Sequence, residues 1–207
     1  MSIKIRQAQP SDSSFLAEMI LQSSRAGKKG GFFDLLFTES DDAHILEKLA
    51  MLTTTEAKSH CNYKNFLIAE IDGTRVGTLC SYEPRISTKE TFIKALEEIG
   101  CKKDIAATLD VFYNCSFKQN KSTLMFDFME EVEGFIDVGI LKALMQKSLL
   151  TARLKGYRVA QTIIEIGSLE AELFYKKLGF VKTAEIECEG YKEVFGRPGL
   201  MLMSIEF

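Results

Sequence analysis

The sequence lacks both glycine-rich motifs that commonly bind nucleotide phosphates. It contains no Gly-x-x-x-x-Gly-Lys-Ser/Thr loop and no Gly-x-Gly-x-x-Gly fingerprint. In those motifs, backbone N–H groups surround the phosphates of a nucleoside triphosphate or a dinucleotide. Their absence argues against a nucleotide-hydrolysing enzyme and against an enzyme that depends on a dinucleotide.

Long apolar runs are also missing. No stretch of the chain approaches the length of an apolar membrane span. Residues 1–7 alternate polar and apolar side chains, whereas a signal peptide has an apolar centre. We therefore expect a cytoplasmic protein that has no membrane partner.

The cysteines never occur in Cys-x-x-Cys spacing, and their number is odd. They are scattered along the chain at Cys61, Cys80, Cys101, Cys115 and Cys188. This arrangement predicts free thiols rather than a disulfide framework or a zinc site. His44 near Asp41 and Asp42 is likewise expected to lie on a capped, solvated helix, so we predict no metal.

Length and charge narrow the class of protein further. The chain has 207 residues, of which 46% are hydrophobic, and this is enough for one well-packed domain. Two independent domains would be cramped, so we expect residues 1–207 to form a single domain. The net charge of -3 argues against a nucleic-acid partner and is compatible with a cationic amine as substrate.

The first half of the chain predicts three strands. Residues 3–6 alternate like a strand and precede an amphipathic helical pattern. The runs 66–71 and 75–79 flank the pair Asp72-Gly73, which can adopt the positive φ angles of a tight turn. The two runs are therefore expected to form a hairpin of the second and third strands. Two helix-like patterns within residues 83–122 then predict a helical insertion before the fourth strand.

The second half alternates strands and helices. The apolar run 124–129 predicts a fourth strand, and a long amphipathic helix follows between Gly139 and Gly156. A fifth strand, a short helix and two closing strands complete the pattern. We therefore predict an α/β fold with a mixed, mostly antiparallel central sheet that has helices on both faces.

A short helical pattern within residues 168–180 contains Ala171, Tyr175, Leu178, Gly179 and Phe180. These residues match the pattern Asn-x-x-Ala-x-x-x-Tyr-x-x-Leu-Gly-Phe. The segment therefore resembles a signature of the GNAT family of acetyl-CoA-dependent N-acetyltransferases. Ser168 replaces the Asn, and its hydroxyl is expected to cap the helix that follows. The resemblance implies the GNAT fold and transfer of an acetyl group from acetyl-CoA to a small-molecule or peptide amine.

The same resemblance implies how the reaction would run. The amine would attack the thioester between the fourth and fifth strands, and a backbone N–H near Met129 would stabilise the oxyanion. The amine also needs a general base. Asp127 is the only ionisable residue in the run 124–129, so it is a candidate for that base, or else an outward-facing strand residue. Tyr175 is a candidate acid for the departing thiolate, or else a residue that packs its helix against the sheet.

The cofactor loop departs from the family pattern Arg/Gln-x-x-Gly-x-Gly/Ala. Ile136 occupies the position of the cation or amide, and Leu141 replaces the second glycine, where its side chain is expected to obstruct the phosphates. The acidic run that includes Glu130 would repel them. The residues expected to contact acetyl-CoA are Met129, Glu131, Val138, Gly139, Ile140, Leu141, Lys142 and Ser168.

Two alternatives stay open at this stage. The altered loop also fits a catalytically silent GNAT-like module that has lost acetyl-CoA binding and binds a partner instead. The insertion at residues 83–122 is expected either to cover the acceptor site or to form a subunit contact, as in a homodimer. The sequence does not decide between these uses.

Overall fold

One mixed sheet organises the molecule. The computed structural model describes residues 2–37, 41–101, 105–118, 122–135 and 139–207. Within them, seven strands lie in the order β1-β2-β3-β4-β5-β7-β6. The strands are β1 (Ile3–Gln7), β2 (Phe66–Ile71), β3 (Thr74–Tyr82), β4 (Thr123–Glu131), β5 (Val159–Glu165), β6 (Val181–Glu187) and β7 (Gly199–Glu206). Only β4 and β5 pair in parallel among these strands, which confirms the predicted fold class.

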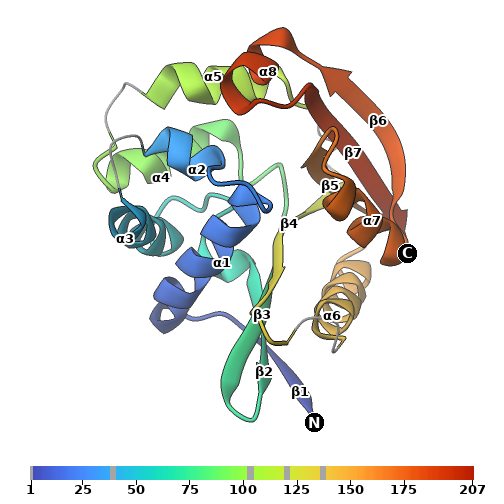
Figure 1. Ribbon diagram of the computed structural model, residues 1–207. Helices are drawn as coiled ribbons and strands as arrows, with labels where there is room; N and C mark the ends of the chain where they lie inside the picture. The colour runs from blue at the N-terminus through green and yellow to red at the C-terminus, as the bar shows by residue number, and fades with distance from the viewer. Residues whose placement is uncertain (1, 38–40, 102–104, 119–121, 136–138) are drawn as a thin grey trace.

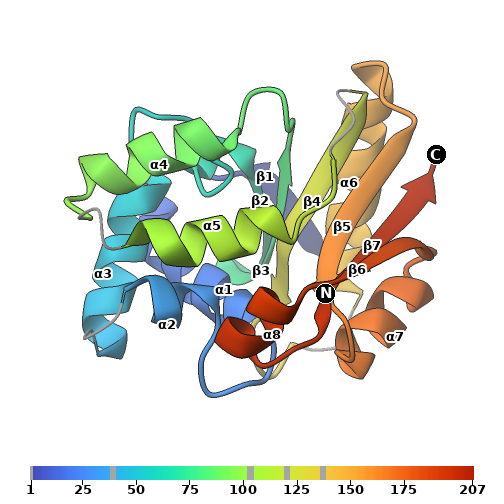
Figure 2. The same cartoon turned by 90° about the horizontal axis from the view of Figure 1, so that it is seen from above.

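Helices cover both faces of the sheet (Figures 1 and 2). One face carries α1 (Ser13–Arg25), α2 (Phe32–Leu36), α3 (Asp42–Thr53), α4 (Lys89–Glu98) and α5 (Ala106–Asn114). The other face carries α6 (Ile140–Leu154) and α7 (Leu169–Lys177). The helix α8 (Glu189–Phe195) lies in the connection between β6 and β7, beside α5. No helix in the described residues is long and apolar enough to cross a membrane.

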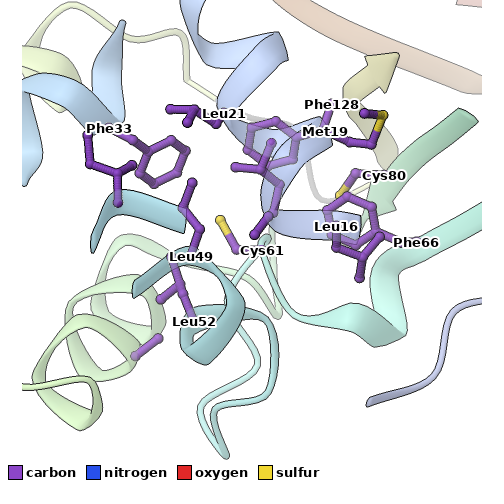
Figure 3. Packing of buried hydrophobic residues seen from close by; sticks show 14 of the residues in the cluster. Leu16, Met19, Leu21, Phe33, Leu49, Leu52, Cys61, Phe66, Cys80 and Phe128 are labelled. Carbon is purple, nitrogen blue, oxygen red and sulfur yellow. The ribbon is translucent and has the colours of Figure 1, made fainter. Parts of the chain in front are cut away.

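The core has a separate cluster on each face because strand side chains alternate. In β2, Phe66 and Ile68 point toward α1, whereas Leu67 and Ala69 point toward α6. Figure 3 shows the cluster on the α1 face, where side chains of α1, α2, α3 and the sheet meet. The same alternation decides which catalytic candidates share a face.

Most of the predicted elements are present. Asp72 and Gly73 have φ angles of 50° and 82° and form the tight turn of the predicted hairpin. The insertion between β3 and β4 contains α4 and α5, as expected. Asp41 caps α3 by accepting a hydrogen bond from the His44 N–H at 2.9 Å. The helices α2 and α8 were not predicted, because five and seven residues are too few to show a helical period.

The prediction that all cysteines are free thiols is wrong. Cys115 and Cys188 form a disulfide across 73 residues of sequence, with their Cα atoms 6.0 Å apart. The bond joins the end of α5 to the start of α8. Sequence spacing could not reveal it, because a disulfide requires only that two Cβ atoms approach in the folded chain. Cys61, Cys80 and Cys101 are free.

Candidate active site

The strands β4 and β5 separate part-way along the sheet. They pair only between residues 123–125 and residues 159–161. Beyond these pairs, β4 continues to Glu131 and β5 continues to Glu165, but the two strands do not pair with each other again in the described residues. The carboxyl ends of two parallel strands therefore diverge, which is where ligands commonly bind in α/β sheets.

A bulge lies in β4 at this opening. Thr78 pairs with Glu130 and Cys80 pairs with Asp127, so two residue steps along β3 correspond to three along β4. Phe128 has a φ of 43°, which is uncommon for a residue with a side chain, and its carbonyl accepts a hydrogen bond from Thr78 Oγ1 at 3.1 Å. Bulges redirect the backbone, and this one does so beside Met129, the expected oxyanion position.

Asp127 lies on the α1 face, partly buried beside the bulge. Its Oδ1 accepts a hydrogen bond from the Phe128 N–H at 2.9 Å. Burial raises the pKa of its carboxyl to about 6, although the bond to Phe128 lowers it. Its negative charge adds to the effect of burial in raising the pKa of the Cys61 and Cys80 thiols. Asp127 is therefore not an ordinary solvated strand residue.

Glu130 is a second carboxylate on the same face. Gln22 Nε2 of α1 donates to its Oε2 at 2.9 Å, and Ser23 donates a further hydrogen bond. Burial raises the pKa of Glu130 to about 7, and the nearby charge of Glu131 adds to this. The sequence did not predict a catalytic role for Glu130, and strict alternation would put it on the face opposite to Asp127. The bulge, which carries no sequence signal here, brings both to one face.

Tyr175 lies on the opposite face, buried between α7 and the sheet. Its ring packs edge-to-face against Phe180, with ring centroids 5.3 Å apart. The hydroxyl is hydrogen-bonded to Thr162 of β5, and burial raises the pKa of the phenol. The charges of Asp127 and Glu130 also raise it. Tyr175 packs in the core cluster on the face of the sheet that α6 and α7 cover.

The N-terminus of α6 borders the opening on the Tyr175 face. Gly139 precedes the helix with a φ of 85°, and a side chain added there would meet nothing within 4 Å. The side chain of Leu141 is buried in the core, whereas the sequence led us to expect it next to the phosphates. The Leu141 N–H instead donates to Glu131 Oε1 at 3.4 Å. A carboxylate of the chain therefore lies where the helix attracts anions.

The other residues expected to contact acetyl-CoA differ from one another in their exposure to solvent. Lys142 is exposed in the first turn of α6, whereas Ile140 is fully buried against the sheet. Ser168 precedes α7 as expected, but its hydroxyl makes no capping hydrogen bond, so this part of the prediction is wrong. Ile136 and Val138 lie outside the described residues.

His60 is a polar residue near the bulge, and its place next to Cys61 in the sequence predicts no thiol chemistry. Its ring packs against the rings of Phe92, Tyr82 and Phe128, at centroid distances of 4.7, 5.6 and 5.8 Å. Burial lowers its pKa to about 4, so the imidazole is neutral at physiological pH.

Comparisons with known proteins agree on the fold. No protein-family model matches this chain, and no curated protein does. A solved structure described as an acetyltransferase matches with a TM-score of 0.68 and 18% identity, covering 98% of this chain and 98% of that chain. A putative GNAT-family acetyltransferase from Desulfovibrio desulfuricans matches with a TM-score of 0.57 and 16% identity, covering 99% of each chain. The PaiA N-acetyltransferase of Thermoplasma acidophilum, solved with coenzyme A, matches with a TM-score of 0.55 and 15% identity over 100% of each chain. At sequence identities this low, the structural matches establish a shared fold and nothing more specific.

Proposed function

We propose that this chain, which has the fold of the GNAT acetyltransferases, transfers an acetyl group from acetyl-CoA to a primary amine. One observation carries the proposal. The strands β4 and β5 diverge beside a bulge that brings the carboxylates of Asp127 and Glu130 to one face, while Tyr175 lies on the other. A nucleophilic amine and a leaving thiol need such groups on opposite sides of the reacting carbon.

The amine has to lose a proton before or during attack, so the reaction needs a base. A base works best when its pKa lies near the operating pH, and the pKa of Glu130 is raised to about 7. Glu130 also meets Gln22 at the surface, where an amine can arrive, whereas Asp127 lies deeper. We therefore assign the role of general base to Glu130 and keep Asp127 as the alternative.

Tyr175 would act on the leaving group. An ordinary phenol has a pKa about 1.5 units above that of a thiol, so complete proton transfer to a thiolate costs roughly 2 kcal/mol. Burial raises the pKa of Tyr175 further and makes it a weaker acid. The phenol is therefore best suited to donating a hydrogen bond to the sulfur as negative charge develops there. The backbone near Met129 is the candidate donor to the acetyl oxygen.

The residues around α6 fit the phosphates of a coenzyme A ligand in part. Acetyl-CoA would supply an acetyl group activated as a thioester. Gly139 leaves open space in front of the helix, Leu141 points inward, and exposed Lys142 adds a positive charge. Glu131 disfavours phosphate binding, because its carboxylate accepts a hydrogen bond from the Leu141 N–H and places a negative charge there. We expect binding that is weakened by Glu131 but not abolished.

The contact of Glu131 also favours a second candidate, a catalytically silent module that does not bind acetyl-CoA. Calorimetric titration with acetyl-CoA, compared with free CoA, separates the two. The enzyme should show saturable binding and should release CoA when primary amines are added. No binding at millimolar acetyl-CoA would reject the enzyme and favour the module.

A further inference from the structure

Two surface depressions lie between α1 and α3, which run side by side in Figures 1 and 2. The first, about 480 Å³ in volume, is bordered by Ser13 at the start of α1 and Thr54 at the end of α3. The second, about 410 Å³, is bordered by Gln22 and by Lys28 in the loop after α1. Glu18 and Leu46 line both depressions, so they join into one feature, here named the α1–α3 groove.

The α1–α3 groove has the length of a short peptide. The helix α1 has 13 residues, and an α-helix of that length is about 20 Å long. An extended chain advances about 3.3 Å per residue, so about six residues would fill the groove. A small amine would occupy only one end of it.

Residues at one end of the groove form hydrogen bonds and an ion pair with both divergent strands. Gln22 Nε2 donates to Glu130 Oε2 at 2.9 Å and to the main-chain oxygen of Glu131 at 3.1 Å, which are both on β4. Lys28 Nζ binds Glu165 Oε2 at 2.7 Å, at the end of β5. An amine at this end of the groove would therefore lie next to the carboxylate proposed as the base.

The uncompensated charges of the groove are negative. Glu18 and Glu47 are exposed, and neither takes part in an ion pair with the other described residues. The basic groups of the groove are neutralised, since Arg25 binds two aspartates at 2.7 and 2.6 Å and Lys28 binds Glu165. The groove therefore favours a cationic occupant.

Apolar side chains lie between these charges. Met51 is 47% exposed, and Leu46 and Ala50 are partly exposed beside it. Lysine and arginine combine a long aliphatic stem with a terminal charge, so they can cover apolar surface while reaching a carboxylate. This mixture suits basic side chains better than it suits an inorganic cation or a short hydrophilic amine.

We infer that the α1–α3 groove binds an extended basic peptide whose free amine is the acetyl acceptor. The inference rests on the proposed acetyl transfer and narrows the acceptor from amines in general to peptide amines. Three observations support the inference: the length of the groove, its acidic charge and its continuity with Glu130.

The test compares three acceptors and two double variants. The acceptors are the hexapeptide Ala-Lys-Ala-Arg-Ala-Lys amide, the same peptide with glutamate in place of its basic residues, and alaninamide. The groove variant is Glu18→Lys with Glu47→Lys. The control variant, Glu187→Lys with Glu206→Lys, makes the same change of charge at exposed positions on β6 and β7.

The groove variant should raise the KM for the basic peptide roughly tenfold, which corresponds to about 1.4 kcal/mol. Its kcat and its affinity for acetyl-CoA should not change, and the control variant should behave like the wild type. Fluorescence anisotropy of the labelled basic peptide should show the same loss of affinity in the absence of acetyl transfer. The measurement is made at low ionic strength, because salt screens surface charges.

The inference is overturned if alaninamide is acetylated with a kcat/KM as high as that of the basic peptide. It is also overturned if the labelled peptide binds the groove variant and the wild type equally. Failure of the proposed function gives a different result, in which acetyl-CoA does not bind and none of the acceptors is acetylated. The anisotropy measurement decides the groove in that case as well.

Discussion

Asp127 and Glu130 lie on the same face of the sheet although they are three positions apart on β4. Strict alternation would place them on opposite faces. The extra residue in the bulge at Phe128 shifts the alternation by one, so that Glu130 reaches Gln22 of α1. A local backbone irregularity therefore assembles the two carboxylates of the proposed site.

The pH dependence of acetyl transfer should report the base. Only the ionised carboxylate accepts a proton, so kcat/KM should rise with pH and level off above the pKa of Glu130, at about 7. Glu130→Gln should lower kcat about a hundredfold and remove this rise, as measured by CoA release from pH 5 to 9. The comparison variant is Asp127→Asn. A midpoint near pH 6 that disappears only in Asp127→Asn would transfer the role to Asp127.

Thermal unfolding provides a check on Glu130 that needs no substrate. Its carboxyl pKa is raised from 4.5 to about 7 in the folded protein, so the folded state holds a proton that the unfolded state has lost between these values. This group therefore makes the folded state less stable as the pH rises through that window. The melting temperature of Glu130→Gln minus that of the wild type should therefore become larger between pH 5 and pH 8. A constant difference would mean that the pKa is not raised.

Glu131→Gln should tighten the binding of acetyl-CoA. The carboxylate of Glu131 accepts from the Leu141 N–H, where it competes with ligand phosphates for the N-terminus of α6. Removing a charge from such a position changes the free energy by about 1 kcal/mol, so calorimetry should show a gain of about fivefold. Glu133→Gln is the matched control, because Glu133 is exposed and its loss changes the net charge equally. Equal gains in both variants would indicate a general charge effect.

Tyr175→Phe should separate packing from catalysis. The ring contact with Phe180 survives the change, so the free energy of unfolding should fall only by the loss of the hydrogen bond to Thr162, about 1 kcal/mol. Loss of a hydrogen bond to a developing charge costs about 1.5–3 kcal/mol, so kcat should fall at least tenfold while acetyl-CoA affinity stays the same. Steady-state kinetics and calorimetry on the same preparation measure both. An unchanged kcat would leave Tyr175 with a packing role alone.

Reduction of the Cys115–Cys188 disulfide should destabilise the fold. The bond closes a loop across 73 residues, and loops of this size contribute about 4 kcal/mol in the chain-entropy view. Urea unfolding of the wild type with and without dithiothreitol should show a loss of about 2–4 kcal/mol, and Cys115→Ser should show the same loss without reductant.

Cys101→Ser is the control for this disulfide, since Cys101 is free. Its unfolding should respond to dithiothreitol as the wild type does. Thiol titration of the unreduced, denatured wild type should find three thiols of the five cysteines. Five titratable thiols would contradict the disulfide directly.

The sequence by itself determined the elements whose signals are local. The hairpin at Asp72-Gly73, the helices of the insertion and the strand-to-helix order before Tyr175 follow from side-chain period, turn chemistry and capping. These depend on neighbours within a few residues, so they can be read without the fold. The resemblance of residues 168–180 to the GNAT signature then led to the fold that the comparisons found.

The tertiary structure alone decided how distant segments meet. Neither the disulfide between Cys115 and Cys188 nor the inward side chain of Leu141 has a local signal. The position of Glu130 depends on a bulge that forms between two paired strands, and the α1–α3 groove depends on how two separate helices pack side by side. Long-range packing sets these relationships, because only the folded chain brings the partners within contact distance.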